Sequence, residues 1–397
     1  MKIAFLTAGG IAPCLSAAIG ALIEEYNQFT PKAELIGYLN GYRGLLLGKS
    51  IKIPEKVKKN AKILYEFGGS PIGNSRVKLT NVDDCIKKGY VKSGEVPLKV
   101  AAKQLINDKV DILHTIGGDD TNTMAAELSN YLKDNNYDLT VVGIPKTVDN
   151  DVIPITQTLG ALTAAEQGAI FFENIVNENT TSTRQLIIHE VMGRHCGWLT
   201  AATAVAYRHR LHKRNFLPEI LLTKERWDID AIYIPEMHFN LQEEMARLKK
   251  LMNEKDCVNI FISEGAGKEE IVAELESSGE VVQRDAFGHV KLDKINPGKW
   301  FAKKFSTELK ADRTLVQKSG YFARSAVPNE KDLALIKATA MLAAESALAS
   351  ESGVAGMDEA AKDAMRLIEF DRIKGGRKFD VNQGWFATLL KQIGQAK

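Results

Sequence analysis

Cysteines are scarce in this 397-residue chain, and their scarcity excludes two classes of protein. Only four are present, and no two stand in a CxxC spacing. A disulfide-stapled secreted domain or a zinc ribbon needs more cysteines at closer spacing. We therefore expect reduced thiols in a cytoplasmic protein. The four positions are Cys14, Cys85, Cys196 and Cys257.

Long apolar runs and an excess of one charge are also lacking. No segment approaches the roughly 18 apolar residues of a membrane-spanning helix, and the apolar residues 1–8 are too few for a signal peptide. The 52 Lys and Arg nearly balance the 50 Asp and Glu, so the formal net charge is only +2. Nucleic-acid binding usually needs a strongly basic face. We expect neither a membrane nor a nucleic-acid partner.

What the sequence does contain is an alternation of short apolar runs and longer helical patterns. With 45% hydrophobic residues the chain can bury a large core. This alternation predicts an α/β protein with parallel sheets, in two lobes that divide near residues 155–160. Strands are expected at 2–7, 34–38, 110–116, 140–144, 185–191, 231–234 and 258–263. Helices are expected at 13–28, 97–108, 121–134, 157–177, 240–254, 298–309, 330–350 and 357–368.

The segment TIGGDDT, residues 115–121, is the most informative part of the chain. Paired glycines let the backbone turn tightly and approach a ligand, and amides at a helix start favour phosphate. Asp119 could hold Mg²⁺, because hard cations prefer carboxylate oxygens. Asp120 adds a second, bulkier negative group where a third glycine would leave room for a nucleotide. Such an Asp pair can also simply cap the helix, and that alternative stays open.

The segment PKTVDND, residues 145–151, is the richest in chemistry. Asp149 and Asp151 stand two apart and could share a side of an extended loop. One carboxylate could then take a proton from a hydroxyl nucleophile. Lys146 supplies a compact charge for phosphate oxygens, and Thr147 can donate a hydrogen bond to the transferred group. The mixture indicates phosphoryl transfer, with an Asx-turn loop as the alternative.

Two weaker segments lie before these. Gly9 and Gly10 permit a tight strand-to-helix turn whose helix start could face an anion, although such glycines can be purely geometric. Their spacing is not the dinucleotide-binding GxGxxG. Arg76 follows a Gly-Asn-Ser loop and could clamp a phosphate, because guanidinium binds phosphate in a fork. A simple surface arginine is the alternative.

Later segments add further polar groups at strand ends. Gly193 would let the backbone approach a ligand, and Arg194 supplies a cation beside it. His195 and Cys196 are expected to be structural, because two adjacent residues rarely form a metal site alone. Glu264 could accept hydrogen bonds from sugar hydroxyls. A phosphate could be bound by Tyr321 and Arg324.

Together these segments resemble the phosphofructokinase family over residues 1 to roughly 330, and most closely its pyrophosphate-dependent branch. ATP-using members typically read Gly-Gly-Asp-Gly and Pro-Gly-Thr-Ile-Asp-Asn-Asp. This chain instead has Asp120 and Lys146 at the two variable positions. Asp120 would fill and negatively charge the space of a nucleotide's α-phosphate and adenosine. Lys146 would add charge for a pyrophosphate that has no nucleotide to anchor it.

The resemblance implies a fold and an activity. The fold would be two Rossmann-like αβα lobes with mainly parallel sheets and the active site in the cleft between them. Residues 1–158 plus about 325–397 would form the larger, donor-binding lobe, and 159–324 the smaller sugar-phosphate lobe. The activity would be a Mg²⁺-dependent, reversible transfer of phosphate from pyrophosphate to the 1-hydroxyl of fructose 6-phosphate. A homo-oligomer is implied as well, and we expect a dimer.

The resemblance also implies residue roles. Asp149 would be the base for the 1-hydroxyl, and Asp119 would organise Mg²⁺. The other catalytic residues would be Lys146, Thr147 and Arg194. The donor would be bound by Gly10, Arg76, Asp120 and Lys146. The sugar phosphate would be bound by Thr147, Asp149, Asp151, Met192, Gly193, Arg194, Glu264, Tyr321 and Arg324.

Two departures from the family matter. Gln185 stands where relatives place an arginine donated across a subunit interface, with Arg184 adjacent, and a one-residue shift turns a strand side chain to the other face. Gly20 and Glu24 stand where allosteric bacterial ATP enzymes carry arginines, so we expect no nucleotide effector.

Three alternatives remain. One is an ATP-dependent enzyme of the same family. Another is an NAD- or lipid-kinase relative, which shares a Gly-Gly-Asp signature but is disfavoured by the later segments. The third is a catalytically silent regulatory subunit that binds sugar phosphates.

Overall fold

The computed structural model describes residues 1–279, 282–283 and 295–395. The chain divides into two compact units. Unit 1 comprises Met1–Thr163 and Arg324–Arg377, and unit 2 comprises Ala164–Ala323 and Lys378–Lys397. Within the described residues, no helix is long and apolar enough to cross a membrane.

Unit 1 is built on a seven-stranded sheet in the order β11-β10-β5-β4-β1-β2-β3. The pairs from β10 to β2 are parallel, and only the two edge strands run antiparallel to their neighbours. Strands β1 and β4 are almost fully buried, which matches their continuous apolar runs and their central place in the sheet. The strands are β1 (Lys2–Thr7), β2 (Glu34–Tyr38), β3 (Ser50–Lys52), β4 (Ile112–Gly117), β5 (Thr140–Pro145), β10 (Gly353–Asp358) and β11 (Ala364–Ile368).

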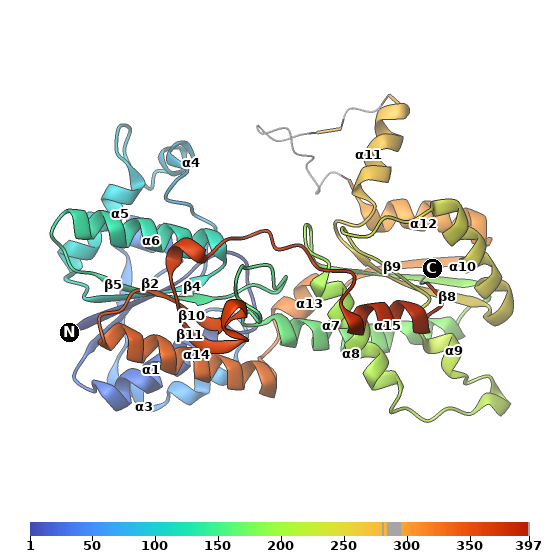
Figure 1. Ribbon diagram of the computed structural model, residues 1–397, viewed down its shortest axis with the longest axis horizontal. Helices are drawn as coiled ribbons and strands as arrows, with labels where there is room; N and C mark the ends of the chain where they lie inside the picture. The colour runs from blue at the N-terminus through green and yellow to red at the C-terminus, as the bar shows by residue number, and fades with distance from the viewer. Residues whose placement is uncertain (280–281, 284–294, 396–397) are drawn as a thin grey trace. The chain divides into compact units, whose positions relative to one another are not determined.

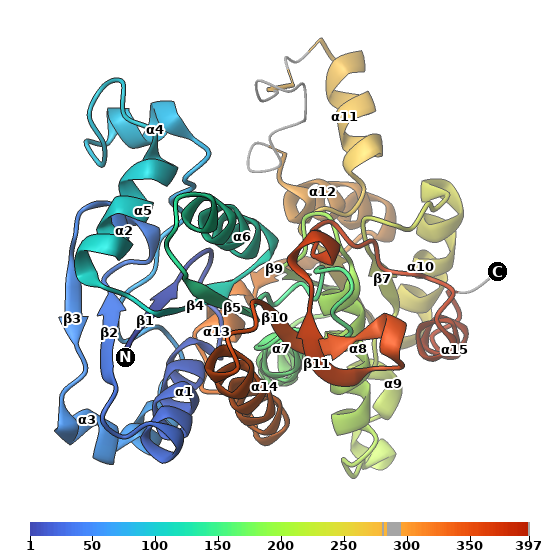
Figure 2. The same cartoon turned by 60° about the vertical axis from the view of Figure 1, so that its left-hand side comes forward.

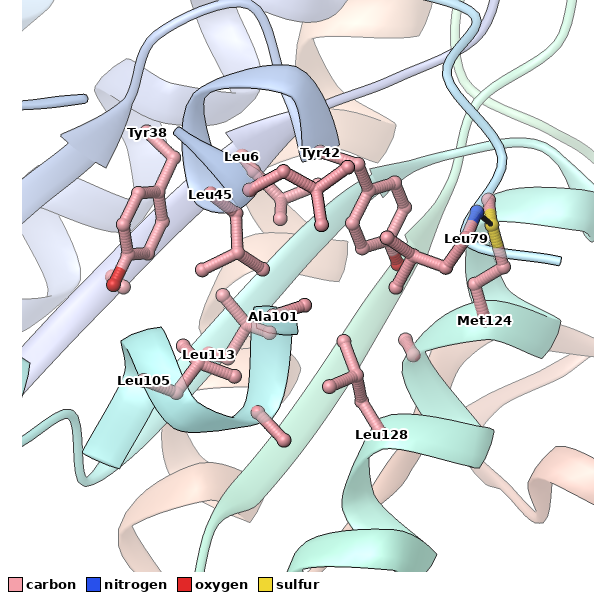
Figure 3. Packing of buried hydrophobic residues seen from close by; sticks show 14 of the residues in the cluster. Leu6, Tyr38, Tyr42, Leu45, Leu79, Ala101, Leu105, Leu113, Met124 and Leu128 are labelled. Carbon is pink, nitrogen blue, oxygen red and sulfur yellow. Dashed lines mark hydrogen bonds between the residues drawn. The ribbon is translucent and has the colours of Figure 1, made fainter. Parts of the chain in front are cut away.

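Helices cover both faces of this sheet (Figures 1 and 2). One face packs against α2, α5 and α6, where Leu6 and Leu113 of the strands meet Leu105 and Leu128 of the helices (Figure 3). On the other face Phe5 of β1 contacts Tyr26 of α1, and α14 packs alongside α1. The helices are α1 (Leu15–Phe29), α2 (Tyr42–Leu46), α3 (Glu55–Lys59), α4 (Val82–Lys87), α5 (Pro97–Asp108), α6 (Asp119–Asp134) and α14 (Glu330–Leu348).

Unit 2 is built on a four-stranded, fully parallel sheet in the order β7-β8-β6-β9. Alternate residues of β6 enter two separate cores, as the strand period of two requires. Leu186 and Ile188 pack with α10 and α12, whereas Ile187 packs with α7, α8 and α15. The strands are β6 (Gln185–Val191), β7 (Ala231–Tyr233), β8 (Cys257–Ser263) and β9 (Arg313–Lys318).

The helices of unit 2 lie on both faces of its sheet (Figure 1). Helix α7 begins in the last residues of the first segment of unit 1, and α13 ends at the first residue of its second segment. They are α7 (Ala161–Ile175), α8 (Trp198–Leu211), α9 (Lys224–Trp227), α10 (Leu241–Lys255), α11 (Lys268–Ser277), α12 (Pro297–Leu309), α13 (Gly320–Arg324) and α15 (Gly384–Gln392).

The predicted α/β class, with two αβα lobes and mainly parallel sheets, is confirmed. All seven predicted strands are present, and seven of the eight predicted helices. The predicted place of the last residues is wrong: 378–397 belong to unit 2. The physical reason is that Phe379, Phe386 and Leu389 are buried in its core.

The helix predicted at 357–368 is also wrong. Strand β10 ends at Asp358, and Lys362 and Asp363 both adopt positive φ, at 55° and 64°. These two left-handed residues turn the chain back, so that β11 pairs antiparallel with β10. The apolar spacing fits a helix, but Leu367 and Ile368 instead add to the sheet edge.

Candidate active site

Three loops of unit 1 meet where neighbouring parallel strands end. Residue Ala8 follows β1, Asp119 follows β4 and Lys146 follows β5, and these three strands are adjacent. The backbone joins the loops: the Ala8 amide donates to Ile116 O at 3.0 Å, and the Lys146 amide donates to Gly117 O at 2.9 Å. The carboxyl edge of a parallel sheet is the usual ligand site of such folds.

Three cations converge on the backbone of Gly10. Lys146 Nζ donates to the Gly10 carbonyl at 2.8 Å. A Cβ added to Gly10 would lie 3.4 Å from a guanidinium nitrogen of Arg76 and equally close to one of Arg324. At Gly9, which has φ +92°, an added Cβ would lie 3.0 Å from Lys146 Nζ. The positive φ of Gly9 favours glycine there, and the absence of a side chain leaves the Gly10 carbonyl open to Lys146.

Burial makes the charged form of Lys146 unfavourable. Its side chain is buried, with the residue only 4% exposed. Burial, above all, lowers the pKa of Lys146 to about 8, and the nearby charges of Arg76 and Arg324 lower it further, while Asp149 opposes them. Three positive groups this close repel one another, and an anionic ligand would reduce that repulsion.

Internal hydrogen bonds fix the loop that carries the two predicted carboxylates. The Thr147 hydroxyl donates to Asp151 Oδ1 at 3.2 Å and accepts from the Asp149 amide at 3.2 Å. Asn150, at φ +53°, accepts at 2.7 Å from the Thr158 amide through its side-chain oxygen. The loop thus combines the turn-like bonding of the alternative interpretation with a fixed placement of Asp149.

Helix α6 starts at the predicted metal residue. Asp119 and Asp120 both lie in its first turn, after Gly118 as N-cap. Asp119 is half-buried and takes part in no ion pair with the described residues. The Asp119 carboxylate lies against Gly375, and a Cβ added to Gly375 would overlap that carboxylate. The buried Asn122 side chain fixes the preceding turn by donating to Gly117 O at 3.2 Å and to Gly118 O at 3.0 Å.

Asp120 has a partner that the motif did not reveal. Lys78 Nζ lies 2.5 Å from Asp120 Oδ2, and the two side chains are 49% and 58% exposed. Lys78 stands two residues after Arg76, with Val77 buried between them. This alternation of exposed cations and buried aliphatics is the sequence signal that could have drawn attention to Lys78.

In unit 2, further predicted residues gather at the carboxyl ends of β6, β8 and β9. Arg194 Nε donates to Glu264 Oε1 at 3.2 Å. Buried Glu190 accepts from Lys318 Nζ at 2.7 Å and from the Gly298 amide at 3.2 Å. A polar cavity of about 100 Å³ is lined by these side chains, and its walls are Glu190, Arg194, Glu264, Ile295, Asn296, Pro297 and Lys318.

The turn after β6 is also specified by glycine. Gly193 has φ +124°, and a Cβ there would overlap the Cys196 carbonyl. The Ser263 hydroxyl at the end of β8 donates to the Gly193 carbonyl. Met192 contacts Gly320, where an added Cβ would lie 3.2 Å from Met192 Cγ.

Four further residues named from the sequence are not among those that line the polar cavity. Arg324 belongs to unit 1 and lies beside Gly10. Tyr321 is 77% exposed. The Arg184 guanidinium donates to Lys310 O at 2.8 Å and to Asn253 Oδ1 at 3.1 Å, and Gln185 is fully buried.

The sequence and structure can be compared with known proteins. The family model described as Phosphofructokinase matches residues 2–347. The chain is 59% identical over 396 residues to the pyrophosphate–fructose 6-phosphate 1-phosphotransferase of Methylomonas methanica, covering 100% of this chain and 97% of that protein. It is 55% identical over 395 residues to the protein of that name from Mastigamoeba balamuthi, covering 100% and 96%.

Structural similarity points the same way. The fold matches the crystal structure of a pyrophosphate-dependent phosphofructokinase from Marinobacter aquaeolei with a TM-score of 0.72 at 19% identity, covering 97% of this chain and 87% of that one. At this identity the match establishes the fold alone. Because the family model spans most of the sequence and the two relatives match it from end to end, the chain belongs to the phosphofructokinase family.

Proposed function

We propose that this chain transfers phosphate reversibly from pyrophosphate to the 1-hydroxyl of fructose 6-phosphate, giving fructose 1,6-bisphosphate and phosphate. The observation that carries the proposal is the convergence of Lys146, Arg76 and Arg324 on the Gly10 backbone. A small, highly charged anion matches three cations around a glycine turn. The names of the two relatives supply independent support.

The donor is assigned to unit 1. Pyrophosphate oxygens would be bound by Arg76, Arg324 and Lys146, with the Gly9–Gly10 backbone beneath them. The pKa of Lys146, lowered to about 8 by burial, leaves this cation protonated at neutral pH. An incoming anion would relieve the mutual repulsion of the three cations and would offset part of the cost of burying Lys146.

Asp120 would exclude a nucleotide chiefly because its side chain fills space that the nucleotide needs. We expected its negative charge to act together with its bulk, but Lys78 at 2.5 Å offsets much of that charge. A half-exposed pair of this kind contributes only about 0–1 kcal/mol to stability, so stability does not explain it. The two side chains together would instead close the space that a nucleotide needs.

Asp149 is the proposed base. As the sugar 1-oxygen attacks the near phosphorus of pyrophosphate, its proton passes to the Asp149 carboxylate. The bond from that phosphorus to the bridging oxygen breaks, and its electron pair leaves with the departing phosphate. General-base assistance of this kind contributes roughly 10²–10⁴-fold. Thr147, which accepts from the Asp149 amide at 3.2 Å, would keep the carboxylate oriented.

The donor set also fits Mg²⁺. No group of three or more metal-binding side chains occurs among the described residues, so the chain would not hold the ion alone. Mg²⁺ typically takes one or two carboxylates and completes its shell with water and phosphate oxygens. The Asp119 carboxylate, outside any ion pair with the described residues and held against Gly375, fits that role. When bound, Mg²⁺ would neutralise charge on the phosphoryl oxygens.

The acceptor is assigned to residues at the carboxyl ends of β6 and β8. Glu264 would accept hydrogen bonds from sugar hydroxyls while Arg194, 3.2 Å from it, offers a cation. Met192 and Gly193 would line the same turn. Tyr321 and Asp151 remain assigned to the sugar phosphate on the family pattern alone. The family pattern assigns Arg324 to the sugar phosphate as well, but its place beside Gly10 moves it to the donor in this proposal.

We also propose a cytoplasmic homodimer without a nucleotide effector. A Cβ on Gly20 would lie 3.0 Å from both the Ala61 carbonyl and Leu64 Cβ. An arginine there would therefore disrupt the packing of α1. Glu24 is occupied as well, because it accepts a hydrogen bond from Tyr65.

Asp149→Asn tests the proposed chemistry. We expect kcat with pyrophosphate to fall by roughly 10²–10⁴-fold, while fructose 6-phosphate binding, measured by calorimetry, stays within a few-fold. Asp138→Asn, an exposed position on the same unit, is the matched control and should retain wild-type turnover. Near-normal turnover of Asp149→Asn would remove Asp149 from the role of base.

A further inference from the structure

The last part of unit 1, residues 370–377, lies against the loops that carry the proposed chemistry. It follows β11 and ends at Arg377, where the chain crosses to unit 2. The family model stops at residue 347, and none of the sequence motifs falls in this segment. Its contacts nevertheless reach both acidic loops of the candidate site.

Side-chain contacts give the segment a defined position on the sheet of unit 1. Ile373 is buried in a small core that includes Val152 and Val354. Arg372 donates from both terminal nitrogens to the Asp358 carboxylate at the end of β10, at 2.8 Å each. Asp358 is fully buried. A bidentate arginine–carboxylate pair is geometrically specific, so it fixes the direction in which the segment leaves the sheet.

Backbone hydrogen bonds join the segment to the chain just beyond the proposed base. The Ile153 amide donates to the Lys374 carbonyl at 2.7 Å, and the Lys374 amide donates to the Ile153 carbonyl at 3.0 Å. The Arg377 amide donates to the Asp151 carbonyl at 3.0 Å. The segment is therefore fixed to the loop that carries the base.

Gly375 lies between these backbone bonds and meets the proposed metal residue. A Cβ added to Gly375 would lie 1.8 Å from Asp119 Oδ2 and 2.3 Å from Asp119 Cγ. Both distances are far below van der Waals contact, so only glycine permits the observed carboxylate position. Conversely, the Gly375 backbone is a wall that limits how the Asp119 side chain can turn.

Close packing without a functional role is the alternative explanation of this contact. The partners of the carboxylate favour a functional role. Within the described residues, the Asp119 side chain takes part in no hydrogen bond and no ion pair. Its position is thus set by the Gly375 wall rather than by a polar partner, and both carboxylate oxygens stay available to a hard cation.

We propose that Gly375 is a positioning residue for Mg²⁺, through which segment 370–377 holds the Asp119 carboxylate in its metal-binding orientation. This inference rests on the proposed function, in which Asp119 and pyrophosphate oxygens bind the ion together. Groups that orient a metal ligand without touching the metal typically change metal affinity by about 10–100-fold when they are altered. Gly375 would act in this way sterically.

Gly375→Ala tests the inference through the metal dependence of pyrophosphate binding. Calorimetry with pyrophosphate, once with excess Mg²⁺ and once with a chelator, gives the factor by which Mg²⁺ tightens binding. In Gly375→Ala this factor should fall by about tenfold or more, because the displaced Asp119 carboxylate no longer meets the ion. The metal-free affinity for pyrophosphate and the affinity for fructose 6-phosphate should stay within a few-fold of the wild type.

Gly384→Ala is the matched control. Gly384 stands nine residues further along the chain, and a Cβ added there meets nothing within 4 Å. This variant should keep the wild-type factor. It separates the effect of the Asp119 contact from that of an added methyl group in the C-terminal part of the chain.

The outcomes distinguish this inference from the proposed function. A large factor in the wild type that persists in Gly375→Ala overturns the inference alone. An equal loss of metal-free pyrophosphate binding and of fructose 6-phosphate binding in Gly375→Ala also overturns it, because general structural damage then explains the variant. A wild type that binds no pyrophosphate, or binds it equally well without Mg²⁺, overturns the proposed function and the inference with it.

A double variant keeps the inference testable if Gly375→Ala does not fold. Asp119→Ala removes the carboxylate that the new Cβ would overlap. The double variant Asp119→Ala/Gly375→Ala should then regain the circular dichroism spectrum and melting temperature of Asp119→Ala, which would support the contact. Continued loss of the fold would place the overlap elsewhere and overturn the proposal.

Discussion

Lys146→Met would test two effects of the buried Lys146 charge: its cost to the stability of the fold and its contribution to pyrophosphate use. The residue is 4% exposed, and burial lowers its pKa from 10.5 to about 8. At about 1.4 kcal/mol per tenfold change in proton affinity, keeping Lys146 charged at pH 7 costs the fold about 3 kcal/mol. Methionine removes the charge and keeps most of the side-chain volume.

The variant also loses the hydrogen bond from Nζ to the Gly10 carbonyl, which is 2.8 Å long. A hydrogen bond from a charged donor contributes about 1.5–3 kcal/mol, so its loss offsets between half and all of the gain. We therefore expect the free energy of unfolding at pH 7 to be unchanged or higher by up to about 1.5 kcal/mol. For pyrophosphate, kcat/KM should fall by about 10–100-fold, because the donor loses one charge-assisted bond.

The pH dependence of stability has a defined sign. Between pH 8 and 10.5 the unfolded chain holds the Lys146 proton and the folded chain does not. In that window the Lys146 contribution makes the wild type more stable as pH rises, and Lys146→Met lacks this contribution. Urea unfolding at pH 7 and pH 10, with coupled rate assays, measures both effects. A loss of more than about 2 kcal/mol at pH 7, or kcat/KM within about threefold of wild type, would refute the reasoning.

Three further predictions concern the donor site. The KM for pyrophosphate should rise as pH increases through 8, where Lys146 loses its proton. Initial rates measured from pH 6.5 to 9.5 test this rise. An equally large rise of KM in Lys146→Met would contradict the assignment to Lys146. Gly9→Ala should raise that KM severalfold with kcat less affected, because Gly9 has φ +92° and the new Cβ would lie 3.0 Å from Lys146 Nζ. An unchanged KM would contradict this prediction. The double variant Asp120→Gly/Lys78→Ala should improve kcat/KM for ATP more than either single change, because each single variant leaves one side chain of the pair in place. A double variant no better than the single variants would contradict the idea that the two side chains fill the nucleotide's space.

Much of the fold could be predicted because its central strands are plain in the sequence. β1, β4 and β6 are short apolar runs followed by glycine or polar residues, and each ends within a residue of its predicted end. β9 was missed because it is an edge strand whose residues are half-exposed and of mixed polarity. The 357–368 segment was mistaken because its apolar spacing fits a helix, while Lys362 turns the chain.

The candidate site could likewise be predicted only in part. Strand ends and glycines located Asp119 and Lys146, since a parallel sheet brings its carboxyl ends to one edge. Pairwise contacts could not be predicted in this way. Lys78 meets Asp120 across 42 residues, through the path of the loop after Arg76. Arg324 lies beside Gly10 although 314 residues separate them in the sequence, and no local pattern encodes that contact.

A comparison of pyrophosphate and ATP as phosphoryl donors, on one preparation of the purified chain with fructose 6-phosphate and Mg²⁺, tests the central claim most directly. We predict fructose 1,6-bisphosphate formation with pyrophosphate and negligible formation with ATP. Turnover with ATP while pyrophosphate stays inert would contradict the account.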